Sequence, residues 1–332
     1  MALAKVWAGS KLHPEALKQL EGIATVITSS TGERVAHGEW EAEAVGADGL
    51  IVILGTTAIT GPVLDRLGPQ LRVVARVGIG VDRVDIDAAT ERGIMVVNTP
   101  DGPTESTAEH AIALMLSLCK EIMLGDRHLR AGQGFPPYGS LPLGLEARGA
   151  TLGLLGLGRI GGRVAEIARV LGMQVLVYDP YINVERAQQY GVELVATLDE
   201  LLPRCNVLSI HSPATPETYH IINAQTLAKL PRGSYLVNVA RGTLVDEQAL
   251  LEALRSGHLA GAALDVFDPE PPQKDNPLFS LPNVVCTPHI ASYTATGVKR
   301  MQVMACEQVA MALRGVRPTN LVNQSVWERR RK

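Results

Sequence analysis

Aromatic residues are scarce in this chain: 3 Phe, 3 Trp and 7 Tyr make up 4% of its 332 residues. Such a composition offers no rows of exposed rings on which single-stranded nucleic acid stacks. The charges nearly balance, with 31 Lys and Arg against 34 Asp and Glu, so the chain also lacks the basic surface that DNA-binding proteins use. The one cationic run, residues 328–332, is interpreted as a solvated tail. We therefore expect no nucleic-acid partner.

Cysteines are few and scattered, and long apolar runs are missing. The four cysteines show neither CxxC nor Cys/His ligand spacing, so we expect buried thiols in a reducing compartment, no disulfide framework and no metal site. No apolar run approaches the length that crosses a bilayer, and the first residues lack the apolar core of a signal peptide. We expect a cytoplasmic protein without a membrane partner.

Short runs rich in Val, Ile and Leu are abundant, and they alternate with helix-like segments along the whole chain. This pattern is typical of parallel sheets with helical crossovers, whose strands are buried on both faces. The length suits two domains. We expect an α/β protein with two doubly wound parallel-sheet domains. The predicted strands span residues 5–8, 24–27, 49–54, 72–77, 95–97, 207–211, 235–238, 261–265 and 284–286.

Residues 151–179 read TLGLLGLGRIGGRVAEIARVLGMQVLVYD, which is an apolar strand, a glycine turn, a helix and a second apolar strand ending in an acid. In such a unit Gly156 would permit the tight turn. Gly158 would let the backbone approach a pyrophosphate, and Gly161 would let the helix pack against the strand. The complete strand, turn, helix and acid predict a Rossmann-type dinucleotide-binding domain.

The residues that follow the glycines indicate which dinucleotide binds. Arg159 and Ile160 begin the helix, where free N–H groups point at phosphates. Asp179 ends the second strand, where a carboxylate accepts hydrogen bonds from the adenosine ribose and repels a 2′-phosphate. We therefore expect NAD as the cofactor rather than NADP.

Three later segments place an arginine, a glutamate and a histidine after predicted strand ends: NVARG, DVFDPEP and TPHIAS. Reduction of a 2-oxo acid by hydride transfer needs a cation for the carboxylate and carbonyl, an acid for the carbonyl oxygen, and a carboxylate that keeps this acid charged. Arg241, His289 and Glu270 would have these three roles as the catalytic residues. Ligands in doubly wound sheets bind beyond the carboxyl ends of the strands, where these residues fall.

Two long helices indicate the domain organisation. A helix at 107–125 would connect the first domain to the fingerprint, and a helix at 295–314 would return the chain to the first domain. We expect a discontinuous, flavodoxin-like substrate domain of residues 1–98 and 292–332, and a Rossmann NAD-binding domain of residues 99–291. The active site is expected in the cleft between them.

The chain resembles the D-isomer-specific 2-hydroxyacid dehydrogenase family, which includes phosphoglycerate dehydrogenase and glyoxylate/hydroxypyruvate reductase. Seven motifs, in the family's order, carry this resemblance over nearly the whole chain. They are VGIGVDRVDIDAATERGI from Val77, TAEHAIALML from Thr107, GLGRIGGRVA from Gly156, HSPATPET from His211, NVARGTLVDEQAL from Asn238, GAALDVFDPEPP from Gly261 and TPHIAS from Thr287.

The resemblance implies further contacts. The substrate carboxylate would be held by Arg241 and by backbone amides around Val77 and Gly78. From the residues alone, Arg76 is either a second cation at the substrate or the polar end of its strand. The same resemblance implies a homodimer formed through the helix at 107–125 and adjoining loops, whereas His110 is interpreted as packing or capping within that helix. The implied NAD contacts are His211, Ser212 and Pro213 at the adenine side, and Val239, Ala240, Arg241, Asp265, His289 and Ser292 at the nicotinamide end.

The substrate is expected to be a small unphosphorylated 2-oxo acid such as glyoxylate or hydroxypyruvate. Phosphoglycerate-specific relatives tend to place an arginine at the end of the strand that here ends in Ile53 and Leu54, and a pocket edged by these residues and Tyr293 suits a small acid. We also expect no C-terminal regulatory domain. The alternatives are D-3-phosphoglycerate dehydrogenase, phosphite dehydrogenase, or an NADH-sensing, corepressor-like binding protein. The loop from Phe135 to Tyr138 is interpreted as a structural lid edge.

Overall fold

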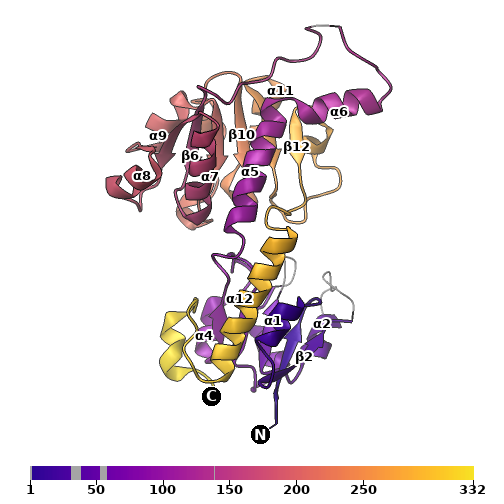
Figure 1. Ribbon diagram of the computed structural model, residues 1–332, viewed down its shortest axis with the longest axis vertical. Coiled ribbons are helices and arrows are strands. Elements are labelled where there is room, and N and C mark those ends of the chain that lie inside the picture. Colours follow the sequence, from indigo (N-terminus) through magenta and orange to yellow (C-terminus); the bar gives the residue numbers. More distant parts are fainter. Residues whose placement is uncertain (1, 31–38, 53–57, 138) are drawn as a thin grey trace. The chain divides into compact units, whose positions relative to one another are not determined.

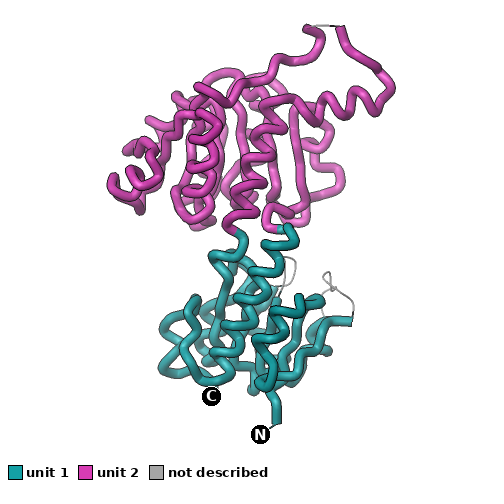
Figure 2. The backbone as a smooth tube through the Cα atoms, in the orientation of Figure 1, with its two compact units in different colours: residues 1–103, 293–332 teal, residues 104–292 magenta. Residues whose placement is uncertain are grey.

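The computed structural model describes residues 2–30, 39–52, 58–137 and 139–332. It divides into two compact units (Figure 2), unit 1 with residues 1–103 and 293–332, and unit 2 with residues 104–292. Each unit contains one parallel β-sheet covered by helices (Figure 1). These two sheets confirm the predicted class of two doubly wound α/β domains.

Unit 1 has a five-stranded parallel sheet with the order β2-β1-β3-β4-β5. This is the flavodoxin-like strand order, as expected. Its strands are β1 (Ala4–Ala8), β2 (Ala24–Thr28), β3 (Gly49–Val52), β4 (Val73–Arg76) and β5 (Met95–Val97), and its helices are α1 (Pro14–Lys18), α2 (Glu39–Ala44), α3 (Gly61–Leu67), α4 (Ile86–Glu91), α12 (Ala295–Leu313) and the 3₁₀ helix η5 (Gln324–Arg329).

Both faces of this sheet are buried because successive side chains of a strand point to opposite faces. Val6 and Ala8 of β1 lie in the core with α1 and α12, whereas Trp7 lies in the core formed with α2, α3 and α4. All four residues of β3 and of β4 are buried. The helix α12 therefore belongs to unit 1, although almost 200 residues of unit 2 precede it in the chain.

The C-terminal residues of unit 1 are docked rather than solvated. Arg331 Nη1 donates to the carbonyl oxygens of Gly68 at 3.2 Å and Leu71 at 3.0 Å, and its amide donates to Gly93 at 2.9 Å. The guanidinium of Arg330 lies 3.5 Å from the ring centroid of Trp327. The interpretation of residues 328–332 as a solvated tail is therefore wrong for Arg330 and Arg331, because arginine satisfies carbonyl groups and stacks on an aromatic ring. Glu328, Arg329 and Lys332 are exposed.

Unit 2 has a seven-stranded parallel sheet with the order β12-β11-β10-β9-β6-β7-β8. The strand order reverses between β6 and β9, which is the topological switch point where dinucleotides bind in Rossmann folds. Its strands are β6 (Thr151–Leu155), β7 (Gln174–Tyr178), β8 (Glu193–Leu194), β9 (Val207–Ile210), β10 (Ser234–Asn238), β11 (Leu259–Leu264) and β12 (Val284–Cys286), and its α-helices are α5 (Thr104–Cys119), α6 (Ile122–Arg130), α7 (Arg159–Val170), α8 (Val184–Tyr190), α9 (Leu198–Leu201), α10 (Ala224–Leu227) and α11 (Glu247–Arg255).

The helix predicted at 107–125 is in fact two helices. α5 ends at Cys119, and Glu121 adopts a left-handed conformation with φ of 54° before α6 begins. The Cys119 carbonyl accepts the Leu145 amide at 2.8 Å, so a distant loop satisfies one of the carbonyl groups that the end of a helix leaves without a partner. This long-range contact ends the helix, and the sequence pattern did not show it.

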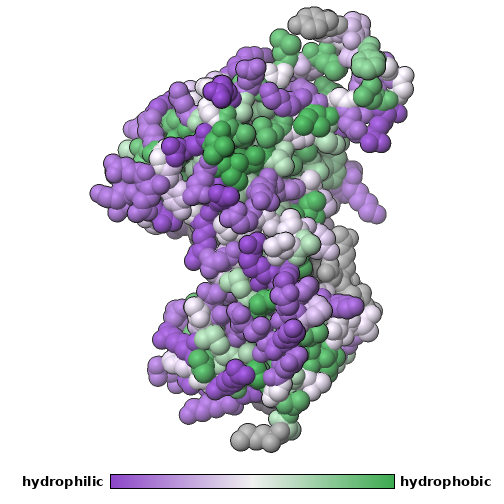
Figure 3. All heavy atoms as spheres, viewed as in Figure 1, coloured by the Kyte–Doolittle hydropathy of each residue, from purple (hydrophilic) through white to green (hydrophobic). Residues whose placement is uncertain are grey.

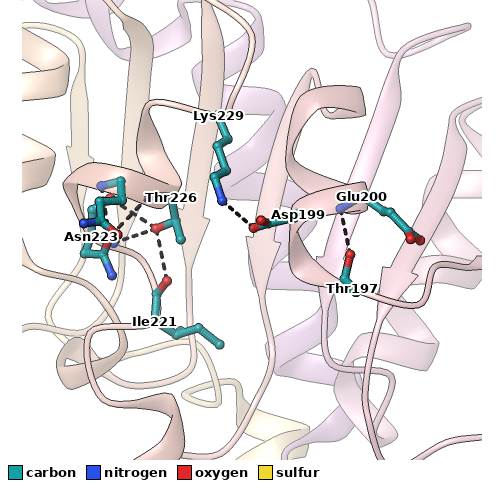
Figure 4. A network of polar contacts seen from close by, with 8 residues as sticks. Thr197, Asp199, Glu200, Ile221, Asn223, Thr226 and Lys229 are labelled. Atoms are coloured by element: carbon teal, nitrogen blue, oxygen red, sulfur yellow. Dashed lines mark hydrogen bonds and ion pairs between the residues drawn. The ribbon is translucent and has the colours of Figure 1, made fainter.

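Short helices on one face of the unit 2 sheet are held by caps (Figure 4). The side chain of Asn223 accepts the amide of Thr226 at 3.2 Å, while the Thr226 hydroxyl accepts the Asn223 amide at 2.8 Å, which is a capping box for α10. Lys229 pairs with Asp199 of α9 at 2.6 Å. Leu201 and Leu227 of these helices are buried in the core beneath them.

Within the described ranges, no helix combines the length and apolar character that a membrane-spanning segment requires.

The four cysteines are free thiols, of which Cys119, Cys205 and Cys306 are buried. Cys286 is exposed, so the expectation of buried thiols is wrong for this residue. Figure 3 shows hydrophilic and hydrophobic residues interspersed on the visible face.

Candidate active site

The glycine-rich turn after β6 is built by close backbone approaches. Gly156 has φ of 101°, and a Cβ atom at this position would lie 3.0 Å from the carbonyl of His211 and the amide of Ser212. A Cβ atom on Gly161 would collide with the Gly156 carbonyl oxygen. By contrast, a Cβ atom on Gly158 would have no atom of the described chain within 4 Å. The turn therefore needs two of its glycines for packing, and the third faces open space.

This open space lies at the N-terminus of α7. The helix begins at Arg159, and its N-cap residue Gly158 has no side chain that could bond the first amides. Asp179, which follows β7, accepts the Leu157 amide with Oδ2 at 2.8 Å and the Tyr181 amide with Oδ1 at 3.0 Å. The carboxylate is thus fixed beside the turn and keeps lone pairs for further hydrogen-bond donors.

His211 and Ser212 pack against this turn, and each has a buried polar atom without a partner in the described chain, Nδ1 and Oγ respectively. The other ring nitrogen of His211, Nε2, lies 2.8 Å from the Ser209 hydroxyl. Burial lowers the pKa of His211 to about 4, so its imidazole is neutral near pH 7. Unsatisfied buried groups are costly and mark sites where a ligand or water completes the hydrogen bonds.

Arg241 lies in a turn that follows β10. The Asn238 side chain organises this turn, because its Nδ2 donates to the Arg241 carbonyl at 2.8 Å and its Oδ1 accepts the Ala240 amide at 3.0 Å. Arg241 Nη1 donates to the Ala240 carbonyl at 2.7 Å. Gly242 packs so close to the Phe267 carbonyl that a Cβ atom would collide with it. This packing places the turn beside the segment that follows β11.

His289 and Glu270 form the central pair of the site. His289 Nδ1 is hydrogen-bonded to Glu270 Oε1. Because a carboxylate only accepts hydrogen bonds, Nδ1 carries the proton in this contact and Nε2 is the nitrogen left for other groups. The two side chains are 34% and 30% exposed, so a small molecule can reach them. The pair therefore has the geometry of an oriented acid–base group.

Asp265, at the end of β11, is completely buried beside this pair. Its carboxylate accepts the Thr287 hydroxyl at 2.6 Å and the amides of Ile290 and Ala291, each at 2.9 Å. Burial by itself would raise the pKa of this carboxyl, but hydrogen bonds from His110, Thr287 and the two amides outweigh it and lower the pKa. Asp265 is therefore a buried, ionised anchor for the segment that contains His289.

Comparisons with known proteins identify the family. Residues 112–291 match the model described as D-isomer specific 2-hydroxyacid dehydrogenase, NAD binding domain. The chain is 41% identical over 280 residues to a glyoxylate reductase of Korarchaeum cryptofilum, and this match covers 84% of the chain and 83% of that protein. The chain belongs to the D-isomer specific 2-hydroxyacid dehydrogenase family. Membership confirms the resemblance, the NAD-binding domain and the oxidoreductase class expected from the sequence.

Two further members of this family resemble the chain. A D-3-phosphoglycerate dehydrogenase of Methanocaldococcus jannaschii is 40% identical over 323 residues, which are 97% of this chain and 60% of that protein. The crystal structure of an NADPH-dependent glyoxylate/hydroxypyruvate reductase from Sinorhizobium meliloti, in complex with NADP and malonate, has a TM-score of 0.83 at 30% identity and covers 100% of this chain and 99% of its own. The chain spans less than two thirds of the phosphoglycerate dehydrogenase, so that activity does not transfer to it by similarity alone.

The contacts of this chain with NAD remain a prediction. Three further residues that are predicted to contact NAD lie as follows. Pro213 follows Ser212, and its carbonyl accepts the Thr218 hydroxyl at 2.8 Å. Val239 is buried in the core beneath the β10 turn. Ser292 is the last residue of unit 2.

The substrate-binding residues predicted in unit 1 already have partners. The Val77 amide donates to Val52 at 3.0 Å, and the Gly78 amide donates to the Thr99 hydroxyl at 2.7 Å. Arg76 is buried at the end of β4, and its Nε lies 3.4 Å from the Gly80 carbonyl. In the described part of the chain, the amides of Ile79 and Gly80 have no such partner. The contact of the substrate with Val77 and Gly78 stays a prediction.

Sequence reasoning missed the contact of His110. Its Nε2 lies 3.1 Å from Thr287 Oγ1 and 3.6 Å from Asp265 Oδ1, so the interpretation of this residue as packing or capping within its own helix is wrong. The sequence feature that could have indicated this contact is the position of His110 on the helical face where Thr107 and Leu114 are buried. The contact was missed because its partner lies almost 180 residues away in the chain. Ile53, Leu54 and Tyr138 lie outside the described residues, and Tyr293 is 56% exposed.

Proposed function

We propose that this chain is an NAD-dependent D-2-hydroxyacid dehydrogenase that reversibly reduces a small 2-oxo acid of the glyoxylate or hydroxypyruvate type. The observation that carries the proposal is the hydrogen bond between His289 Nδ1 and Glu270 Oε1. Arg241 follows β10, which is the neighbour of β11 in the same sheet, so all three residues belong to the carboxyl edge of unit 2. This edge is where doubly wound folds bind their ligands.

NADH, when bound, supplies the hydride that reduces the substrate carbonyl. Arg241 would form a two-pronged contact with the substrate carboxylate and polarise the carbonyl. His289 would give the proton on Nε2 to the carbonyl oxygen, while Glu270 holds Nδ1 and stabilises the positive charge of the ring. In the oxidative direction the neutral ring would accept the hydroxyl proton at Nε2.

The residues of the turn fit NAD. The pyrophosphate would lie against Gly158 and the first amides of α7, where no Cβ atom and no capping side chain fills the space. Asp179 would accept the ribose hydroxyls. The unpartnered His211 Nδ1 and Ser212 Oγ would complete their hydrogen bonds at the adenine side.

In unit 1, we assign the substrate carboxylate contact to the amides of Ile79 and Gly80. Two observations support this assignment. The amides of Val77 and Gly78 already donate to acceptors within the unit, whereas the amides of Ile79 and Gly80 have no acceptor among the described residues. Gly78 has φ of 127°, a conformation that side chains rarely adopt, and it turns the backbone at this point.

D-3-phosphoglycerate oxidation is the second candidate, because several relatives at 39–46% identity have the name D-3-phosphoglycerate dehydrogenase. The sequence favours an unphosphorylated acid, since Ile53 and Leu54 occupy the stretch where phosphoglycerate-specific relatives tend to place an arginine. Phosphite oxidation and an NADH-sensing role are tested in the same experiment.

The experiment is NADH oxidation by the purified protein with glyoxylate, hydroxypyruvate, pyruvate and 3-phosphohydroxypyruvate, with NADPH in parallel and phosphite with NAD in the reverse direction. Rapid turnover of an unphosphorylated acid supports the proposal. A clear preference for 3-phosphohydroxypyruvate moves the second candidate to first place. Tight NADH binding without turnover of any compound contradicts an enzymatic role and favours the sensor.

We further propose a homodimer and a cytoplasmic location, both expected from the sequence. α6 has no buried residue in the single chain, and it presents Ile122 and Leu129 with more than half of their surface exposed. The loop that follows exposes Phe135 at 96% and Leu143 at 86%. Figure 3 shows hydrophobic residues among hydrophilic ones on this projecting segment at the upper right. Exposed apolar surface of this kind marks an interaction site, and a second copy would cover it.

A further inference from the structure

A single buried carboxylate fixes the backbone on both sides of His289. Before His289, the hydroxyl of Thr287 donates to Asp265 Oδ1 at 2.6 Å. After it, the amides of Ile290 and Ala291 donate to Oδ1 and Oδ2, each at 2.9 Å. The His289 amide also donates to the Asp265 carbonyl at 2.9 Å. Asp265 therefore bonds to Thr287 before the imidazole, to the His289 amide, and to the two residues that follow it.

This control matters because His289 adopts an unusual backbone conformation. Its φ is 52°, in the left-handed region that is uncommon for residues other than glycine. Such a conformation persists only where the surroundings determine it. The four hydrogen bonds to Asp265 are these surroundings, and they set the direction in which the imidazole leaves the chain.

His110 of α5 completes the same network from another element. Its Nε2 lies 3.1 Å from Thr287 Oγ1 and 3.6 Å from Asp265 Oδ1. A hydroxyl has one proton, and Thr287 gives it to the carboxylate, which only accepts. Thr287 Oγ1 must therefore accept from His110, so the proton of His110 is on Nε2. The order of donation runs from His110 to Thr287 and from Thr287 to Asp265.

We propose that His110 is a positioning residue for His289, which acts through Thr287 and Asp265 and does not touch the substrate. The proposal rests on the proposed role of His289 as proton donor. Without the donor at position 110, Thr287 Oγ1 loses its hydrogen bond to α5, and the segment around His289 is held by Asp265 alone. The imidazole then spends less time in line with the substrate carbonyl.

The test compares two variants of the full-length protein, His110→Leu and His110→Gln. Leucine keeps bulk and removes the donor, whereas the Nε2 amide of glutamine replaces the ring Nε2–H. The matched control is His258→Leu, which removes a histidine that is hydrogen-bonded to the Leu227 carbonyl at 2.9 Å elsewhere in unit 2. Steady-state kinetics, the primary deuterium isotope effect with deuterated NADH, and thermal unfolding are measured for each variant.

We expect His110→Leu to lower kcat roughly 10- to 100-fold, because a small misplacement of a reacting group costs about that much. The KM for NADH stays close to the wild-type value, and the isotope effect on kcat increases since the chemical step becomes slower. His110→Gln restores most of the rate. A wild-type kcat in His110→Leu overturns the proposal, as does an equal loss in the glutamine variant or a loss that only follows the melting temperature as in the control.

If the wild-type protein turns over no 2-oxo acid, the proposed function is refuted, and kinetics cannot test the role of His110. A second measurement then tests that role without turnover. In ¹⁵N-histidine NMR spectra, with His289→Gln used to assign the signals, the His289 ring resonances should shift in His110→Leu and stay in place in His258→Leu. Unchanged His289 signals in His110→Leu overturn the positioning role whatever the activity.

Discussion

Asp179 Oδ2 accepts the Leu157 amide at 2.8 Å, so the end of β7 is bonded directly to the glycine-rich turn. The carboxylate that would select the cofactor is thereby held at a fixed distance from the backbone that would bind its phosphates. The Gly156 amide also donates to the Tyr178 carbonyl at 2.9 Å, so two hydrogen bonds join the end of β7 to this turn.

Replacement of Asp179 should relax the preference for NADH. We expect Asp179→Ser to raise the KM for NADH and to shift the NADH/NADPH ratio of kcat/KM by at least about 10-fold, which corresponds to roughly 1.4 kcal/mol. Both cofactors are compared in steady-state assays, with Asp199→Asn, an exposed ion-pair residue of α9, as the control. An unchanged ratio would show that Asp179 does not contact the ribose.

Two glycine variants separate packing from cofactor binding. Gly161→Ala places a methyl group against the Gly156 carbonyl, so we expect a destabilisation of about 1–3 kcal/mol together with weaker NADH binding. Gly158→Ala meets no atom of the described chain, so it should keep the wild-type melting temperature and still bind NADH more weakly. Calorimetry and NADH fluorescence titration measure the two effects. Normal NADH affinity in Gly158→Ala would place the pyrophosphate elsewhere.

Removal of the proposed proton donor should lower kcat without weakening the binding of NADH. We expect His289→Ala to lose roughly 10²- to 10⁴-fold in kcat and to bind NADH like the wild-type protein. Arg241→Lys should also be strongly impaired although its charge is unchanged, because lysine cannot form the two-pronged contact. Stopped-flow measurement of hydride transfer checks both variants. Full activity of either one removes that residue from the catalytic set.

Because His211 is buried, we expect the free energy of unfolding to depend on pH. Its pKa is lowered to about 4 from the ordinary value of 6.5, so between these values the unfolded chain binds a proton that the folded chain does not. The free energy of unfolding therefore falls as the pH is lowered through this window, by about 2 kcal/mol between pH 7.5 and pH 5. Urea unfolding at both pH values is compared for wild type and His211→Leu without cofactor. Equal pH dependence in the two proteins would contradict this origin.

Loss of apolar side chains on the projecting loop should separate the proposed dimer. We expect the double variant Phe135→Ser and Leu143→Ser to be a monomer by light scattering at concentrations where the wild-type protein is a dimer. Val170→Ser is the control, because Val170 is 87% exposed on α7 outside this segment. A wild-type protein that is monomeric at every concentration rules out the dimer.

Local features of this protein could be predicted from the sequence because their partners are near in the chain. The turn from β6 to α7 and the acid after β7 follow from glycine spacing and strand periodicity over fewer than 30 residues. Asn183 and Thr197 likewise cap the helices that begin directly after them. The break between α5 and α6 could not be predicted, since it depends on a loop that returns to the Cys119 carbonyl.

The sequence pattern specifies the α/β class, the parallel sheets implied by alternating elements, and the residue types of the proposed chemistry, because periodicity and turn residues act locally. Which groups meet in the folded protein depends on long-range packing. It brought His110 to Thr287, left the Ile79 and Gly80 amides rather than those of Val77 and Gly78 without a described partner, and docked Arg331 on the carbonyl groups of Gly68 and Leu71. The physical reason is that buried polar groups must find partners, and the nearest partner in space is often distant in sequence.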